Sequence, residues 1–415
     1  MNLFKISWKY LLFKPLSTGL NVILLAMGLA IITVLLLVQD QLEQTINRDA
    51  AGIDLVVGAK GSPLQLILSG VYHVDFPTGN IPLKEAKGLL RNRLVKSAIP
   101  MALGDNFQGF RIVGTNHDYL SLYETKMATG QAWEYPFEVV LGASVSKVSG
   151  LKTGDEFEGS HGISIGSHAH DENKFKVRGV LEESGSVIDR LILTSVESVW
   201  LSHEEAGEDE KKHEEVQQLM EAPVAKSGFP DGDDTKEITT LLLQYRSPMA
   251  AIQLPRMINS RTTMQAASPS FEMVRLFELL GVGIGLLKGI AIILIFISGL
   301  GIFIALYNSL KERKYDLAIL RGLGASRLQL MILIFLEGIS ITILGAILGL
   351  ILGHSFLWLL IQNTDQAMAV SISPWIFLQE ELWVIVYALV VGMLASVLPA
   401  FTAYQTSIAK QLTKS

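Results

Sequence analysis

Three closely spaced histidines, His161, His168 and His170, are the residues whose type and spacing best fit a metal site. Neutral imidazoles are common zinc ligands, and histidines separated by one residue lie on the same side of an extended segment. Asp171 and Glu172 follow and could add carboxylate ligands. The neighbouring glycines and serines are equally typical of a solvated polar loop, and no cysteine supports a zinc pattern. Two interpretations remain open, a zinc site and an ordinary loop.

Glu337 is the second ionisable residue of interest, because it lies within a long apolar run. A charge at membrane depth costs about 2.5–3.5 kcal/mol on insertion scales, so such a side chain faces protein rather than lipid. We expect a structural or coupling role for it rather than a catalytic one. His354 lies in the same run, and we expect it to be packed among neighbours rather than to bind a ligand.

A phosphate-binding P-loop and a zinc-protease motif are both absent from the sequence. The segment Gly58-Ala59-Lys60-Gly61-Ser62 lacks the spacing of a phosphate-binding P-loop. No His-Glu-x-x-His pair occurs, and the chain contains no cysteine. We therefore predict no catalytic residue and no cofactor in this chain, apart from possible zinc.

Four apolar runs are long enough to cross a membrane. Each contains roughly 20 or more mainly apolar residues, which is enough for about 30 Å of hydrocarbon. We place the membrane helices at 17–40, 279–307, 331–361 and 382–404, with a short external loop at 362–381.

The charges beside these runs predict the topology. Residues 1–16 carry three lysines and no acid, and the tail 405–415 carries two lysines and no acid. Both termini are therefore expected inside the cell, with 1–16 serving either as a helix in the lipid headgroup layer or as a topology signal only. The net charge of −6 gives no basic footprint, which argues against nucleic acid as a partner.

The long polar region 41–278 is expected outside the membrane, because long domains cross it regardless of their charge. Its strand and helix patterns are interspersed without regular alternation, which predicts an α+β domain. The fold class is thus an α-helical membrane protein with four transmembrane helices and a large α+β extracytoplasmic domain. The candidate strands are 53–57, 110–114, 137–141, 175–181, 188–194 and 237–244, and the candidate helices are 83–92, 195–203 and 253–265.

A basic segment at 308–330, called the elbow here, joins the second and third membrane helices. Its excess of Lys and Arg over acids marks a cytoplasmic loop. The apolar spacing predicts an amphipathic helix of about three turns that ends at Gly322 and Gly324, and Ser326 with Gln329 has capping-box spacing for the next helix. The segment could couple to a partner or could be a charged loop that only fixes topology.

Two rows of glycines at every fourth position predict smooth helix faces on which another backbone can pack closely. One row is Gly281, Gly285 and Gly289, and the other is Gly345, Gly349 and Gly353. Each could pack within the chain or against a second subunit.

The segment K-E-R-K-Y-D-L-A-I-L-R-G-L-G-A-S at 311–326 resembles the cytoplasmic loop of MacB/FtsX-type (type VII) ABC transporter permeases, which include lipoprotein-release and macrolide-exporter systems. Residues 140–142, 150–155, 177–181 and 399–404 resemble further elements of that family. The resemblance implies a permease subunit of the bacterial inner membrane, with its large domain in the periplasm and no enzymatic activity of its own.

The resemblance also implies a mechanism, mechanotransmission, in which a dimer of separate ATPase subunits binds ATP and Mg²⁺ and moves the elbow. It implies pairing with a second permease subunit, as a homodimer or heterodimer, contact with lipid, and a possible periplasmic or outer-membrane partner. The coupling residues on the elbow would be Tyr315, Leu317, Leu320, Arg321, Gly322 and Gly324.

Two other classes of protein remain open from the sequence. A membrane-anchored metal-binding protein or hydrolase would use the three histidines. A channel or secondary transporter would use the membrane helices, although one interior carboxylate offers a poor path for a polar substrate. The cargo is not identified by the sequence; lipoprotein, peptide or other envelope cargo all suit this architecture.

Overall fold

The computed structural model describes residues 3–161, 169–203, 222–231, 235–362 and 372–405. The chain forms two compact units. The membrane unit draws on Met1–Gln41, Leu279–Asn363 and Ile372–Ser415, and the external unit consists mainly of Leu42–Glu278. Each unit is described by itself.

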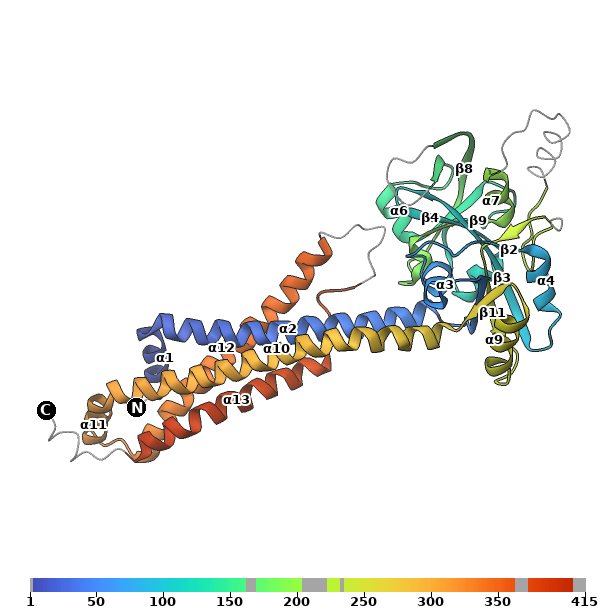
Figure 1. The fold of residues 1–415 in the computed structure, drawn as a ribbon. Coiled ribbons are helices and arrows are strands. Elements are labelled where there is room, and N and C mark those ends of the chain that lie inside the picture. The colour runs from blue at the N-terminus through green and yellow to red at the C-terminus, as the bar shows by residue number, and fades with distance from the viewer. Residues whose placement is uncertain (1–2, 162–168, 204–221, 232–234, 363–371, 406–415) are drawn as a thin grey trace. The chain divides into compact units, whose positions relative to one another are not determined.

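The helices of the membrane unit are long and almost entirely apolar. Four of them could span a membrane by length and composition: α2 (Pro15–Asp49), α10 (Pro269–Glu312), α12 (Arg327–Gln362) and α13 (Gln379–Tyr404). Two shorter helices, α1 (Leu3–Phe13) and α11 (Lys314–Gly322), lie at the elbow end of the unit (Figure 1). Four candidate transmembrane helices were predicted, and this part of the fold class is confirmed.

Two apolar clusters hold the membrane helices together. Midway along the unit, Leu25 and Leu29 of α2 pack with Ile295 of α10, Ala346 of α12 and Ala388 of α13. A second cluster at the elbow end joins five helices through Leu11, Leu306, Leu317, Leu330 and Ala403. The elbow is therefore packed into the unit rather than attached as a free loop.

The external unit is built on a mixed ten-stranded sheet in the order β12-β1-β11-β3-β4-β9-β6-β8-β5, with β7 pairing with β3 and β8. The β4–β9 and β6–β8 pairs are parallel and the others are antiparallel. The strands are β1 (Leu55–Ala59), β3 (Val95–Phe107), β4 (Phe110–Thr115), β5 (Met127–Gly130), β6 (Glu138–Leu141), β7 (Glu156–His161), β8 (Ala169–Leu181), β9 (Leu191–Ser195), β11 (Thr240–Tyr245) and β12 (Met264–Ala267). A small second sheet pairs β2 (Ile81–Pro82) with β10 (Glu237–Ile238).

Side chains alternate across this sheet and fill a core on each face. Leu55 and Val57 belong to one core, and Val56 between them belongs to the other. The same alternation separates Leu242 from Leu241 and Leu243 on β11. The covering helices are α3 (Pro63–Gly70), α4 (Leu83–Leu90), α5 (His117–Leu122), α6 (Ala143–Ser149), α7 (Val196–His203) and α9 (Ala250–Arg261). A mixed α and β external domain was predicted, and it is confirmed.

Some segment predictions were wrong at their ends. Residues 187–190 form a 3₁₀ turn before β9 instead of the start of a strand, because Asp189 turns back to bind nearby backbone amides. The segment 237–244 divides into β10 and β11, and the end of 253–265 becomes β12. The 13-residue strand β3 was not predicted, since Pro100 and Gly104 interrupt its apolar pattern.

Candidate functional site

The elbow is a short helix set between two sharp changes of direction. Helix α10 ends at Glu312, α11 occupies Lys314–Gly322, and Gly324 turns the chain with a φ of +103°. The cap of α12 follows, because the backbone N–H of Ser326 donates to Gln329 Oε1 at 2.8 Å and Gln329 N–H donates to Ser326 Oγ at 3.2 Å. The bonding predicted from the Ser-x-x-Gln spacing is therefore present, and it fixes the exit of the chain from the elbow.

A buried ion pair fastens the start of α11 to α12. Arg313 donates two hydrogen bonds to the carboxylate oxygens of Glu337, each 2.8 Å long, and the Glu337 side chain is 1% exposed. The guanidinium also donates to the carbonyl and hydroxyl of Ser309, and it lies 4.1 Å from the centre of the Tyr10 ring. We call Arg313, Glu337, Ser309 and Tyr10 the clasp. Its bidentate geometry is the strong form of a charge-assisted hydrogen bond.

Helix α1 is also fastened to the elbow. Its residue Leu11 is buried in the apolar cluster that also contains residues of α10, α11 and α12, and Lys14 just beyond α1 forms an ion pair with Glu312. An adjacent face of α1 exposes Phe4, Trp8 and Leu12. This amphipathic arrangement suits a helix lying in a lipid headgroup layer, one of the two roles expected for residues 1–16.

The predicted coupling residues separate into two groups. Leu317 is buried in the apolar cluster, while Leu320 and Arg321 are half-buried. Tyr315, Gly322 and Gly324 are exposed. The exposed apolar row of the elbow is Tyr315, Ile319 and Leu323, which are 55%, 44% and 80% exposed. Inward residues thus position the elbow, and the row is left open to a partner.

The two glycine rows differ in their surroundings. A Cβ added at Gly349 would lie 2.8 Å from the Leu29 side chain and 3.0 Å from the Ala26 carbonyl oxygen, so this row packs against α2. Gly345 and Gly353 face Leu25 and Thr33 of the same helix. At Gly281, Gly285 and Gly289, no described atom lies within 4 Å of such a Cβ apart from the adjoining residues and nearby backbone of α10 itself. That second row is therefore bare in the single chain.

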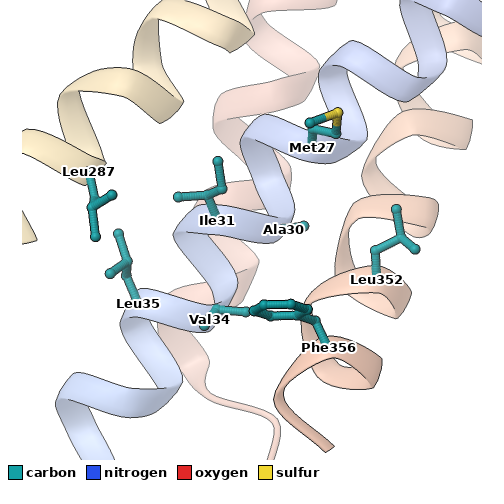
Figure 2. Close-up of a pocket in the computed structure, with 8 residues that line it drawn as sticks. All are labelled: Met27, Ala30, Ile31, Val34, Leu35, Leu287, Leu352 and Phe356. Atoms are coloured by element: carbon teal, nitrogen blue, oxygen red, sulfur yellow. The ribbon is translucent and has the colours of Figure 1, made fainter. Parts of the chain in front are cut away.

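An apolar cavity of about 460 Å³ lies between α2, α10 and α12 (Figure 2). Five lining residues come from α2, one from α10 and two from α12: Met27, Ala30, Ile31, Val34, Leu35, Leu287, Leu352 and Phe356. All eight side chains are hydrocarbon or thioether, so the cavity suits an apolar occupant such as an acyl chain. It offers no polar groups for a hydrophilic solute.

The ends of α2 and α10 enter the core of the external unit. Leu42 and Ile46 from α2 and Met273 from α10 pack in the same apolar cluster. Two hydrogen bonds also hold the end of α2. The Asp49 carboxylate accepts from the backbone N–H of Val187 at 2.9 Å, and the backbone carbonyl of Asp49 accepts from the Tyr123 hydroxyl at 2.6 Å. Burial raises the pKa of Tyr123 well above its ordinary value, so the hydroxyl remains a donor.

The turn around Asp189 fixes the backbone to which Asp49 of α2 is bonded. Its carboxylate accepts from the backbone amides of Ser184 at 3.0 Å and Gly185 at 2.6 Å. Val187, which bonds to Asp49, lies within the same turn. The end of α2 is therefore bonded to a turn that is itself fixed.

The proposed zinc ligands cannot be placed. His168 lies outside the described residues, and only the backbones of His161 and His170 are described, in β7 and β8. Among the side chains that are described, no group of three His, Asp or Glu residues could hold a metal ion. Zinc binding remains a prediction from the sequence.

The clasp was not foreseen in full. Glu337 was singled out from its position in an apolar run, whereas Arg313 was counted only as one of several basic residues and Tyr10 was not considered. Arg313 and Glu337 are 24 positions apart in the sequence, and Tyr10 is much further from both. The one signal in the sequence is that a buried carboxylate needs a cation. That signal alone would select Arg327, the arginine nearest to Glu337 in the sequence, rather than Arg313.

Comparison with known proteins gives matches at both ends of the chain. Residues 18–240, more than half of the chain, match the MacB-like periplasmic core domain family. Residues 288–408 match the FtsX-like permease C-terminal family. An uncharacterized ABC transporter permease of Methanocaldococcus jannaschii is 27% identical over 128 residues, which cover 30% of this chain and only 31% of that protein.

Two solved structures are also similar. The periplasmic region of MacB from Actinobacillus actinomycetemcomitans aligns with 56% of this chain and 97% of that structure, at 10% identity and a TM-score of 0.33. The extracellular domain of the noncanonic ABC-type transporter YknZ from Gram-positive bacteria aligns with 52% of this chain and 99% of that structure, at 13% identity and a TM-score of 0.28.

Proposed function

Because this chain belongs to the MacB/FtsX-type family of ABC transporter permeases, we propose that it couples ATP hydrolysis by a separate ATPase to movement of its external domain. The observation that carries the proposal is the elbow, which is fixed on its inner side and apolar on its outer side. In this proposal the elbow and both termini lie in the cytoplasm, and the external unit lies in the periplasm of a bacterial inner membrane. ATP and Mg²⁺ bind to the partner, and this chain performs no catalysis.

The exposed row on the elbow is the proposed ATPase contact. Tyr315, Ile319 and Leu323 recur every four residues and so lie along one side of the helix. Exposed apolar side chains rimmed by charged residues such as Lys314 and Asp316 are typical of a protein–protein contact. The clasp then transfers a push on this row to α12, because Arg313 joins the two helices.

Movement would reach the external domain through α2 and α10. These helices contain 35 and 44 residues, or about 52 and 66 Å at about 1.5 Å per residue, which exceeds the hydrocarbon core of about 30 Å. Their far ends pack within the external unit's core. The ATPase can shift the permease only if its two states bind the elbow with different free energy.

A second permease subunit fits the bare glycine row. Gly281, Gly285 and Gly289 have no neighbour within the described chain, and small residues at this spacing let two helices approach closely. Cysteine placed at Gly285 in this cysteine-free chain should form a disulfide with a second copy in native membranes. In a heterodimer no such bond would form between two copies of this chain.

The direct test of the proposal replaces the exposed row. Ile319→Asp with Leu323→Asp should abolish copurification of the ATPase and transport, while leaving the permease folded. Val148→Asp, which adds the same charge at an exposed apolar position of the external unit, is the matched control and should behave as wild type. Retained ATPase association and full transport in the double variant would reject the row as the contact.

A second test addresses the residues that hold and turn the elbow. Replacing Leu320, Arg321 and Gly324 together should disturb how α11 is held. ATP hydrolysis should then continue without transport. Preserved ATPase association together with full transport would reject the elbow as the coupler.

The other two classes have their own tests. Zinc uptake by the purified protein that is lost when His161, His168 and His170 become alanine would support a metal site, and hydrolysis of a substrate without the ATPase would support a metal hydrolase. Solute flux without any ATPase would support a channel or secondary transporter. Copurification from native membranes should identify the ATPase, any periplasmic or outer-membrane partner, and the lipoprotein, peptide or other cargo.

A further inference from the structure

At the end of the membrane unit opposite the elbow, a buried histidine and a buried glutamate hold the segment that precedes α13. His354 of α12 has its Nδ1 atom 2.6 Å from the carbonyl oxygen of Pro374. Its Nε2 atom lies 3.1 Å from Glu381 Oε2 in the first turn of α13. The side chains of His354 and Glu381 are 11% and 0% exposed.

These contacts determine how many protons the pair must hold. A carbonyl oxygen only accepts hydrogen bonds, so Nδ1 must carry a hydrogen and donate it to Pro374. In a neutral imidazole Nε2 then has a lone pair, and an ionised carboxylate also presents lone pairs. Two acceptors facing each other at 3.1 Å without water would be strongly unfavourable. One additional proton, on either Nε2 or Oε2, converts the contact into a hydrogen bond.

We propose that His354 and Glu381 form a proton-binding site, and that the bound proton holds residues 372–378 against the membrane helices. The site is distinct from the elbow and the clasp, and it does not depend on the proposed coupling function.

Both members of the pair also bind the backbone of this segment. His354 holds Pro374, and the second oxygen of Glu381 accepts from the backbone N–H of Leu378 at 3.1 Å. Gln41 of α2 holds Ser373 at both backbone atoms, with distances of 2.7 and 2.9 Å. Loss of the proton would leave Nε2 and Oε2 as two acceptors that repel each other. This repulsion would push apart the two side chains that hold Pro374 and Leu378 and would leave the Gln41 bonds as the remaining fastening.

Two aromatic rings flank the imidazole, and a few charged residues lie on neighbouring elements. The rings of Trp375 and Phe377 lie nearly parallel to the imidazole, at 6.3 and 6.5 Å between centroids. Three further charged residues lie on the neighbouring elements: Glu380, exposed in the same turn as Glu381; Asp40, adjacent to Gln41 on α2; and Lys288 of α10, which donates to Gln39. None of the hydrogen bonds described for the pair involves them.

Hydrogen exchange measured by mass spectrometry tests the site in the full-length permease in lipid nanodiscs. The readout is the protection factor of the peptide containing Ser373 and Leu378, corrected for intrinsic exchange at each pH from about 5 to about 10. We expect wild-type protection to fall by about tenfold or more toward the alkaline end, as the proton is lost.

Glu381→Gln is the decisive variant, because its amide N–H can donate to Nε2 permanently while its carbonyl still accepts from Leu378. Protection in this variant should remain high at every pH. Glu380→Gln removes the neighbouring exposed carboxylate and should keep the wild-type pH dependence. Constant wild-type protection over the whole range, or an alkaline loss in Glu381→Gln equal to that of wild type, would overturn the proposal.

Discussion

Breaking the clasp should cost far more than breaking an ordinary surface ion pair. Glu337→Gln keeps the size of the side chain but removes the negative charge beside Arg313, whose side chain is 13% exposed. Removing one partner of a buried pair costs about 3–5 kcal/mol, and we expect about 3 kcal/mol here because Arg313 is partly accessible and keeps its bonds to Ser309. An exposed pair such as Lys14–Glu312 should contribute less than about 1 kcal/mol.

A double-mutant cycle measures this coupling. Glu337→Leu, Arg313→Met and the double variant are unfolded in mixed detergent micelles, with tryptophan fluorescence as the signal. Each single variant leaves a buried charge or carboxylate without its partner, whereas the double variant leaves neither and should recover about 2 kcal/mol or more. Lys14→Met serves as the control on the exposed pair.

Two outcomes would refute this reasoning. One is a loss of less than about 1 kcal/mol in Glu337→Gln, which would place the pair among the surface ion pairs. The other is additivity of the two single variants, which would show that the 2.8 Å contacts contribute no coupling energy. Transport measured with the ATPase present should fall in Glu337→Gln even where the protein remains folded.

Three further predictions concern single residues of both units. Burial lowers the pKa of His73 to about 3, against about 6.5 in an unfolded chain, so its share of the free energy of unfolding is present above pH 6.5 and is lost as the pH falls. Between pH 7 and pH 5 the free energy of unfolding, measured by denaturation at each pH, should fall by about 2 kcal/mol more in wild type than in His73→Asn. Asparagine is chosen because it tolerates the φ of +55° at this position. Gly349→Ala should destabilise the membrane unit by about 1–3 kcal/mol because its Cβ would collide with α2, whereas Gly285→Ala should stay within about 0.5 kcal/mol in the same unfolding assay. Gly324→Ala should cost about 1–2 kcal/mol because the residue has a positive φ, while Gly322→Ala, in open space on α11, should be neutral or slightly stabilising.

The parts of the structure that could be predicted from the sequence depend on local interactions. Long apolar runs need no partner to be recognised as membrane helices, and the Ser326–Gln329 cap forms within four residues. Gly324 likewise breaks the helix through its own backbone conformation. For the same reason β3 was missed, since its pairing with β4 and β11 outweighs the weak strand propensity of Pro100 and Gly104.

The parts that could not be predicted depend on which elements meet. The two glycine rows have the same spacing in the sequence, yet only the row containing Gly349 has a neighbouring helix within the described chain. His354 was expected to be simply packed, but it bonds to a glutamate 27 residues away. Pairings of this kind follow from tertiary packing, and no local pattern records them.

The continuity of α2 within the membrane unit sets a rotational phase along the helix. Leu25 lies against Gly345 at one level, and Thr33 lies against Gly353 about two turns further along. One alanine inserted between these levels would turn everything beyond it by about 100°, whereas seven would come close to two full turns and restore the original facing. Register along this helix, more than its composition, should therefore decide which lengthened variants still work.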